Sequence, residues 1–259
     1  MITPRTPRLI PLACLALLLA AGCSERPAGT AASPVPPSTA VPAPPRTTGN
    51  LVGLGDAAAY AALANGGSVT VHAEPGGGKA LDLIPPKLSW GTPTPFLVRE
   101  ARRVEGRVWY RVLLPKRPNE SSGWVRADQV RTAPRDYRAQ IDLSERRLSL
   151  YKGDELLRSF PVGIGRPATP TPTGRFFVTV KLRPPQISTV YGAWALGLSA
   201  FSQVLAQFGT GDGQIALHGT SNPANLGHQV SNGCVRLDNA SISTLAALLE
   251  PGSPVDVQA

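Results

Sequence analysis

The stretch that decides the fold reads Ser231-Asn232-Gly233-Cys234-Val235-Arg236-Leu237, and it follows His218-Gly219-Thr220 in the chain. The chain has 3 cysteines. Cys14 and Cys23 both lie near an N-terminus that resembles an export signal, which leaves Cys234 without a partner for an internal disulfide. A free thiol in an exported chain is either buried and inert or a nucleophile. The neighbouring histidine motif favours the nucleophile.

A cysteine attacks as its thiolate, so it needs a base that takes the proton. His218 is the expected base, and it must reach Cys234 through a loop or across neighbouring strands. Gly219 lets the chain turn after the histidine, while Ser231 is expected to stabilise the loop by local hydrogen bonds. Gly233 lets backbone amides crowd next to the sulfur. The N–H groups of residues 232–234 are therefore the expected oxyanion hole.

The N-terminus has the pattern of a secretory signal, residues 1–22. Arg5 and Arg8 precede an apolar run over 9–21 that is too short for a lasting membrane span. The run ends before Cys23 in a way that resembles a lipoprotein signal, so we expect Cys23 to carry lipid; simple signal cleavage and an uncleaved anchor are the alternatives. Residues 23–66 are rich in proline and small residues and are expected to form a disordered tether. The sequence thus predicts an exported, membrane-anchored lipoprotein that faces the cell wall or periplasm.

The rest of the chain predicts a mainly β protein in two parts. Residues 67–133 show short alternating strands split by glycine turns, as in a small barrel, and the positions of Trp109 and Trp124 resemble a bacterial SH3-like domain. Residues 134–259 begin with a hairpin and continue with further strands. A helix is expected over 242–249, starting near Asp238 or Asn239, and a short helix over 56–65.

The second part resembles the L,D-transpeptidase (YkuD-type) catalytic domain. The likeness covers roughly residues 137–257 and rests on Asp142-Leu143-Ser144, Thr171-Pro172-Thr173-Gly174, His218-Gly219-Thr220, Gly227 and the Cys234 stretch. It implies a β-sandwich-like domain with few short helices, Cys234 as nucleophile and His218 as base, with the carbonyl of Gly219 orienting the ring. The family often has His or Arg where this chain has Asn232, which cannot titrate.

The resemblance implies a reaction on peptidoglycan stem peptides. Cys234 would attack the carbonyl of the diamino acid at the third position, expel the terminal D-alanine and form a thioester that an amine resolves. The acceptor is left open as a stem amine, a protein, a D-amino acid or water, the last giving an L,D-carboxypeptidase. A non-catalytic wall-binding lipoprotein is the alternative from another class.

Other residues and partners complete these expectations. Arg236 either binds a substrate carboxylate or pairs within the loop; Tyr191 and Trp194 either line the cleft or pack; His228 is expected to be a loop residue. No cofactor and no metal are expected, because His218, His228 and Cys234 lack a fourth ligand.

The net charge is +9, and residues 67–133 contribute 11 Lys and Arg against 6 Asp and Glu, or +5. This excess points to anionic cell-wall polymers as partners of the SH3-like part, or to a merely soluble surface, and the arginine spacing does not indicate nucleic acid. We expect a monomer.

Overall fold

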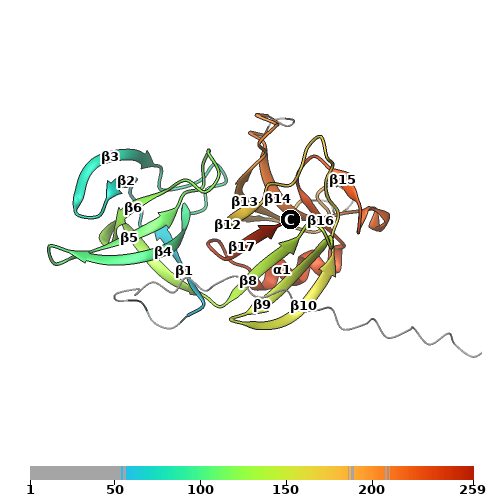
Figure 1. The fold of residues 1–259 in the computed structure, drawn as a ribbon, viewed down its shortest axis with the longest axis horizontal. Helices are drawn as coiled ribbons and strands as arrows, with labels where there is room; N and C mark the ends of the chain where they lie inside the picture. The colour runs from blue at the N-terminus through green and yellow to red at the C-terminus, as the bar shows by residue number, and fades with distance from the viewer. Residues whose placement is uncertain (1–53, 55–56, 186, 188–189, 208, 210) are drawn as a thin grey trace, which may run out of the picture. The chain divides into compact units, whose positions relative to one another are not determined.

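The computed structural model describes residues 54, 57–185, 187, 190–207, 209 and 211–259. The expected signal (1–22), the lipidation site Cys23 and most of the expected tether lie outside the described residues. The described chain is mainly β, as predicted, with two large sheets formed one after the other along the sequence (Figure 1). Within the described residues no helix is both long and apolar enough to cross a bilayer.

The first sheet is antiparallel and has the strand order β3-β2-β6-β5-β4-β1-β7. Its core is formed by buried side chains from all of its strands, among them Val71, Phe96 and Val112. The strands are β1 (Ala59–Ala64), β2 (Val69–Glu74), β3 (Gly77–Ile84), β4 (Pro95–Val104), β5 (Arg107–Leu113), β6 (Ser122–Arg126) and β7 (Val130–Arg135), with a 3-10 turn at Ala127–Gln129.

The prediction of a helix over residues 56–65 is wrong. Residues 59–64 form β1, which pairs with both β4 and β7, and all six of its side chains are buried. Alanine favours a helix only weakly against tertiary contacts, and two ladders of backbone hydrogen bonds outweigh that preference. β1 also lies inside the range assigned to the tether, so this part of that range is an ordered strand.

The second sheet has the order β10-β9-β8-β17-β12-β13-β14-β16. Its two ends nearly meet: Gly163, just after β10, donates its N–H to the carbonyl of Arg236 in β16 (2.9 Å) and accepts the Arg236 N–H (2.7 Å). These bonds give the sheet a nearly closed, barrel-like form. Its elements are β8 (Tyr137–Asp142), β9 (Arg147–Lys152), β10 (Glu155–Pro161), β12 (Gly174–Leu182), β13 (Ala195–Phe201), β14 (Gln214–Gly219), β16 (Val235–Leu237) and β17 (Pro254–Gln258), with a separate parallel pair of β11 (Ile164–Gly165) and β15 (Gln229–Ser231) and a 3-10 turn at Pro223–Asn225.

The single α-helix among the described residues, α1 (Asn239–Leu248), confirms the helix expected near the C-terminus. Asp238 caps it by accepting the Ser241 N–H (2.8 Å). Ile242, Leu245 and Leu249 are fully buried in the same core as Leu217 and Val235. The helix therefore fills the space enclosed by the curved sheet, directly behind the strands that carry the predicted catalytic residues.

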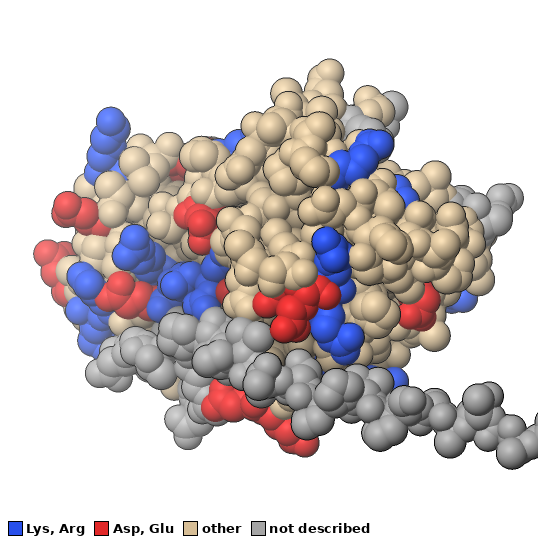
Figure 2. Space-filling model, turned by 45° about the vertical axis from the view of Figure 1, so that its right-hand side comes forward, with Lys and Arg blue, Asp and Glu red and all other residues tan. Residues whose placement is uncertain are grey.

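On one face of the molecule, basic and acidic groups are mixed rather than gathered in one continuous basic area (Figure 2). On the face drawn in Figure 2, blue basic groups lie beside red acidic ones, and wide areas carry neither. Arg126 with Asp128 and Lys116 with Asp82 are two such pairs in the first sheet. The positive excess of residues 67–133 is thus partly offset where it is exposed.

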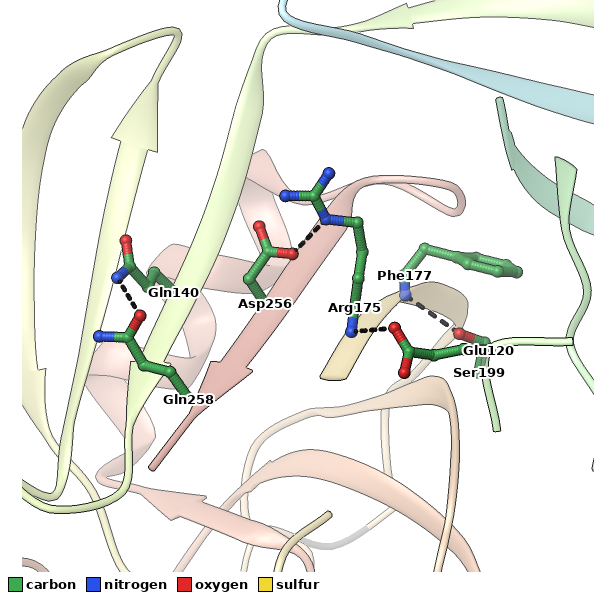
Figure 3. Close-up of polar contacts among 7 residues, drawn as sticks. All are labelled: Glu120, Gln140, Arg175, Phe177, Ser199, Asp256 and Gln258. Atoms are coloured by element: carbon green, nitrogen blue, oxygen red, sulfur yellow. Dashed lines mark hydrogen bonds and ion pairs between the residues drawn. The ribbon is translucent and has the colours of Figure 1, made fainter. Parts of the chain in front are cut away.

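A small apolar cluster joins the two sheets. Ala59, Leu97 and Leu113 of the first sheet pack with Phe177 of β12, which is fully buried. The backbone N–H of Phe177 donates to Ser199 (3.1 Å), and next to it Arg175 pairs with Asp256 (2.6 Å) (Figure 3). The surface of the second sheet is therefore partly a buried interface with the first.

The loop over residues 114–121, called the docking loop here, adds polar bonds to this interface. Arg117 donates to the carbonyls of Ser202 (2.7 Å), Leu205 (3.0 Å) and Asp212 (3.0 Å), and its guanidinium lies 5.0 Å from the Phe201 ring centroid.

Two further side chains of the docking loop bind backbone groups of the second sheet. Asn119 pairs with Phe201 twice, since its amide donates to the carbonyl (2.9 Å) and accepts the N–H (2.8 Å). Glu120 accepts the backbone N–H of Arg175 (3.0 Å; Figure 3). These bonds attach the docking loop to the start of β12 and the end of β13.

Candidate active site

The two predicted catalytic residues lie on neighbouring strands. β14 and β16 pair in parallel, with Leu217 opposite Val235 and His218 opposite Arg236. Leu217 and Val235 point into the core. Because side chains alternate along a strand, His218 and Arg236 point to the other face, and Cys234 directly precedes β16 at the level of Ala216. The pairing of β14 with β16 thus brings His218 and Cys234 near each other across neighbouring strands, which is one of the two arrangements expected from the sequence.

His218 is held in a defined tautomer. The side chain is 3% exposed, and its Nδ1 lies 2.7 Å from the carbonyl oxygen of Gly219. A carbonyl can only accept, so Nδ1 carries the proton and Nε2 has the lone pair that a base needs. No described hydrogen bond uses Nε2. The backbone carbonyl of Gly219 therefore accepts the Nδ1 proton of His218, which is the contact that the family resemblance implies.

Burial keeps both groups neutral. It lowers the pKa of His218 to about 4, helped by the positive charge of Arg236 and opposed by the bond to Gly219. Burial also raises the pKa of the Cys234 thiol above its ordinary value, although a bond to the Ala216 backbone and the charge of Arg236 act the other way. This environment therefore favours the neutral thiol, which needs a base to take its proton.

No hydrogen bond joins the thiol to the imidazole among the bonds formed by the described residues. The positions on adjacent strands place the two side chains on the same face, one strand step apart along the sheet. A thiol that is not bonded to the imidazole is in keeping with a site whose catalytic bonds tighten when substrate is present.

The catalytic loop, residues 231–234, is built on Ser231. Its hydroxyl accepts the Gly233 N–H (3.1 Å) and donates to the carbonyl of Cys234 (2.5 Å). The expectation for Ser231 is met. The expectation that Gly233 offers its amide to an oxyanion is not, because that N–H is already used. The amides of Asn232 and Cys234 take part in none of the described hydrogen bonds and are the remaining candidates.

Gly233 is needed for its conformation instead. Its φ is +117°, and a Cβ there would lie 2.8 Å from Ile215 Cδ1. Both the positive φ and the close approach exclude a side chain. A residue with a side chain at 233 would therefore strain the backbone next to Cys234.

The Thr171-Pro172-Thr173-Gly174 motif has a structural role at the site that sequence reasoning missed. Thr171 is buried; its hydroxyl accepts the Gly165 N–H (2.9 Å) and donates to the carbonyl of Gly233 (2.8 Å). Thr169 donates to the carbonyl of Ser231 (3.2 Å). In the sequence the motif contributes to the family likeness without a role of its own. In the structure, the hydroxyls of Thr169 and Thr171 bind the backbone of the catalytic loop.

Two further side chains support the surroundings of His218. The Tyr191 ring meets the imidazole edge to face, with centroids 5.3 Å apart, and is 45% exposed. Asn239, at the start of α1, accepts the Ala193 N–H (2.8 Å), and the carbonyl of Trp194 accepts the Gly219 N–H (3.1 Å). Trp194 packs at the edge of the core. Tyr191 thus borders the site. Asn239 is a supporting residue that sequence reasoning marked only as a possible helix start.

The remaining candidates lie apart from this chemistry. The ring of His228 is exposed and its carbonyl accepts the Ile164 N–H, as expected of a loop residue. In the described part of the chain, no group of three or more His, Cys, Asp or Glu side chains is arranged to hold a metal ion.

Similarity to known proteins agrees with this geometry. The family model for the YkuD L,D-transpeptidase catalytic domain matches residues 136–257. The YkuD protein of Bacillus licheniformis is 30% identical over 165 residues, which cover 61% of this chain and 92% of that protein. The chain belongs to the YkuD family.

Two further relatives extend the comparison. The YkuD protein of Bacillus subtilis is 30% identical over 121 residues, 47% of this chain and 65% of that protein. The solved structure of an L,D-transpeptidase from Mycobacterium smegmatis is 17% identical, with 64% of this chain and 100% of that chain covered and a TM-score of 0.40.

Within the YkuD domain of this chain, Asn232 has a neighbour that sequence reasoning did not find. The guanidinium of Arg166 donates to the Asn232 side-chain oxygen, and the Arg166 N–H donates to the carbonyl of Ser231 (3.0 Å). Arg236 lies beside both Cys234 and His218 and forms no ion pair among the described residues. The structure therefore does not support the alternative in which Arg236 pairs within the loop.

Proposed function

We propose that this protein is a peptidoglycan L,D-transpeptidase that forms a thioester at Cys234. The observation that carries the proposal is the parallel pairing of β14 and β16, which presents the free Nε2 lone pair of His218 and the thiol of Cys234 on one face. Membership of the YkuD family supports the reaction class.

In the proposed acylation, Cys234 Sγ attacks the carbonyl carbon of the third stem residue while its proton passes to His218 Nε2. Negative charge develops on the carbonyl oxygen, where the amides of Cys234 and Asn232 are the available donors. The tetrahedral intermediate then collapses, and its C–N bond breaks. The proton returns from His218 to the departing amine of D-alanine, which leaves a thioester on Cys234.

In the second half, an acceptor amine attacks the thioester carbonyl and gives up a proton to His218. The C–S bond breaks and the thiol is regenerated with that proton. A water molecule in place of the amine would release the free acid. His218 acts in both halves as base and then as acid, a role suited to a ring whose Nδ1 is fixed by Gly219.

The parts of the chain outside this site have proposed roles as well. We assign residues 1–22 to a signal, Cys23 to lipid attachment, 23–66 to a tether, 67–133 to an SH3-like part and 134–259 to catalysis. Residues 59–64 belong to the first sheet and so qualify the extent of the tether. The first sheet would bind anionic cell-wall polymers, and the protein would face the wall or periplasm.

The test is incubation of the protein, lacking residues 1–23, with muropeptides that carry tetrapeptide stems. Mass spectrometry should show loss of D-alanine, a thioester adduct on the protein and cross-linked dimers. Cys234→Ala should abolish all three, while Arg158→Gln, an exposed change on β10, should leave them intact. Unchanged turnover in Cys234→Ala would overturn the proposal, and tripeptide without dimers would assign the protein as a carboxypeptidase.

A further inference from the structure

Two arginines flank the catalytic loop without a carboxylate partner. Arg166 follows β11, and Arg236 lies in β16 two residues after Cys234. Neither forms an ion pair with any described residue. By contrast, Arg175 pairs with Asp256 and Lys181 with Glu250, and the guanidinium of Arg117 is bound by backbone carbonyls. Two unpaired guanidinium groups on either side of a nucleophile indicate an anionic ligand.

Arg236 is the inner member of the pair. Its Nε is buried and has no hydrogen-bond partner, which is costly unless a ligand supplies one. Its charge lowers the pKa of both Cys234 and His218, so it lies within electrostatic reach of the reacting groups. Its backbone is fixed by the two bonds to Gly163 that close the sheet. A guanidinium on so rigid a strand is preorganised.

Arg166 is the outer member. Its side chain is exposed, yet it is anchored at one nitrogen by the Asn232 amide oxygen, directly over the loop that carries Cys234. A guanidinium has five N–H donors, so one bond to Asn232 leaves others for a ligand. The amide of Asn232 cannot itself carry charge. It instead holds a cation at the position where the family often has His or Arg.

We propose that Arg166 and Arg236 form a carboxylate-binding subsite that selects acyl donors with a free carboxylate on the residue after the scissile bond. In the reaction proposed above, on which this inference rests, that residue is the terminal D-alanine. A guanidinium binds a carboxylate through two parallel N–H bonds, whereas a terminal amide offers neither charge nor a second acceptor. Arg166 is then a specificity residue that recognises the donor without taking part in proton transfer.

The first experiment does not depend on transpeptidation. Cys234 is alkylated with iodoacetate, which carries a carboxylate, and with neutral iodoacetamide, and the two rates are compared by mass of the modified peptide. Arg166→Gln and Arg236→Gln should each lower the iodoacetate to iodoacetamide ratio about threefold, the effect of removing one nearby charge in a solvated site. Arg166→Lys keeps the charge and should keep the ratio, and Arg158→Gln is the matched control.

The second experiment uses two synthetic stems that differ only in a C-terminal carboxylate or carboxamide. The protein should prefer the acid about 10- to 100-fold in kcat/KM, and Arg166→Gln or Arg236→Gln should reduce that preference. A ratio of alkylation rates that is the same in all variants, or a preference for the amide, overturns the subsite. A changed ratio without any turnover supports the subsite and counts against the proposed reaction alone.

Discussion

The docking loop and the catalytic loop use arginine in opposite ways. In the docking loop, the Arg117 guanidinium donates hydrogen bonds to three backbone carbonyls. Asn119 and Glu120 bind further backbone groups of the second sheet. Around the catalytic loop, neutral hydroxyls hold the backbone, and the charged groups of Arg166 and Arg236 have no carboxylate partner.

This comparison distinguishes arginines that stabilise the fold from arginines that are available to bind a ligand. An arginine whose nitrogens are bound by carbonyls stabilises the fold, since its removal breaks several charge-assisted hydrogen bonds at once. An arginine that is held in place but has unused N–H donors is able to bind a ligand. Substitutions in the two loops should therefore affect different measurements.

The largest effect is expected at His218. His218→Gln removes the base and should lower the rate of thioester formation by about 10²- to 10⁴-fold, because the neutral thiol then has no group to accept its proton. Single-turnover acylation, followed by mass spectrometry, measures it. The melting temperature at pH 7.5 should hardly change. A loss below threefold would mean that another group takes the proton.

The next effect is the dependence of stability on pH. The pKa of His218 is about 4 in the folded protein, against 6.5 ordinarily. A depressed pKa contributes stability above the unfolded value, and this contribution is lost as pH falls from about 6.5 to 4. The wild type should lose about 3 kcal/mol more than His218→Gln between pH 7.5 and 4.0, as measured by urea unfolding. Equal losses in both proteins would contradict the neutral, buried imidazole.

Arg117→Ala tests the docking loop. Three carbonyls lose a charged donor, so the free energy of unfolding should fall by about 2 to 3 kcal/mol. Arg103→Ala is the matched control, because Arg103 is exposed and donates to one carbonyl only; it should cost under about 0.5 kcal/mol. Alkylation of Cys234 by iodoacetamide should be unchanged at 20 °C in both. If Arg117→Ala altered the alkylation ratio as Arg236→Gln does, the contrast between the loops would fail.

The smallest effect is expected at Thr171, which supports both the stability of the fold and the position of the catalytic loop. Thr171→Val keeps the shape of the side chain but leaves the Gly165 N–H and the Gly233 carbonyl unpaired, so it should cost about 2 kcal/mol. Acylation should also slow several-fold, because the Gly233 backbone sets the position of the sulfur. Thr173→Val, at the neighbouring threonine of the same motif, is the comparison. Similar rates in the two variants would show that Thr171 serves stability alone.

The sequence predicted those features that local pattern encodes. Alternating apolar residues and glycine turns give the strands, and Asp238 before an apolar face gives α1. The motif around Cys234 gave the family and the two residues now found on adjacent strands. β1 was mistaken for a helix because its partners, β4 and β7, lie far away in the sequence.

Roles that depend on tertiary contacts were not predictable. Arg166 meets Asn232 across 66 positions of sequence, and Thr171 meets Gly233 across 62. No spacing rule connects such pairs. The neutral state of the thiol was equally hidden, since it follows from burial, which composition does not reveal.

The burial of Cys234 has a consequence for durability. Peroxides and disulfides react with the ionised form of a cysteine, so a sulfur kept protonated until a peptide arrives is slow to be damaged. We expect the resting protein to withstand hydrogen peroxide at concentrations that oxidise an exposed cysteine of ordinary pKa. The burial that delays ionisation thus also protects the nucleophile from oxidation.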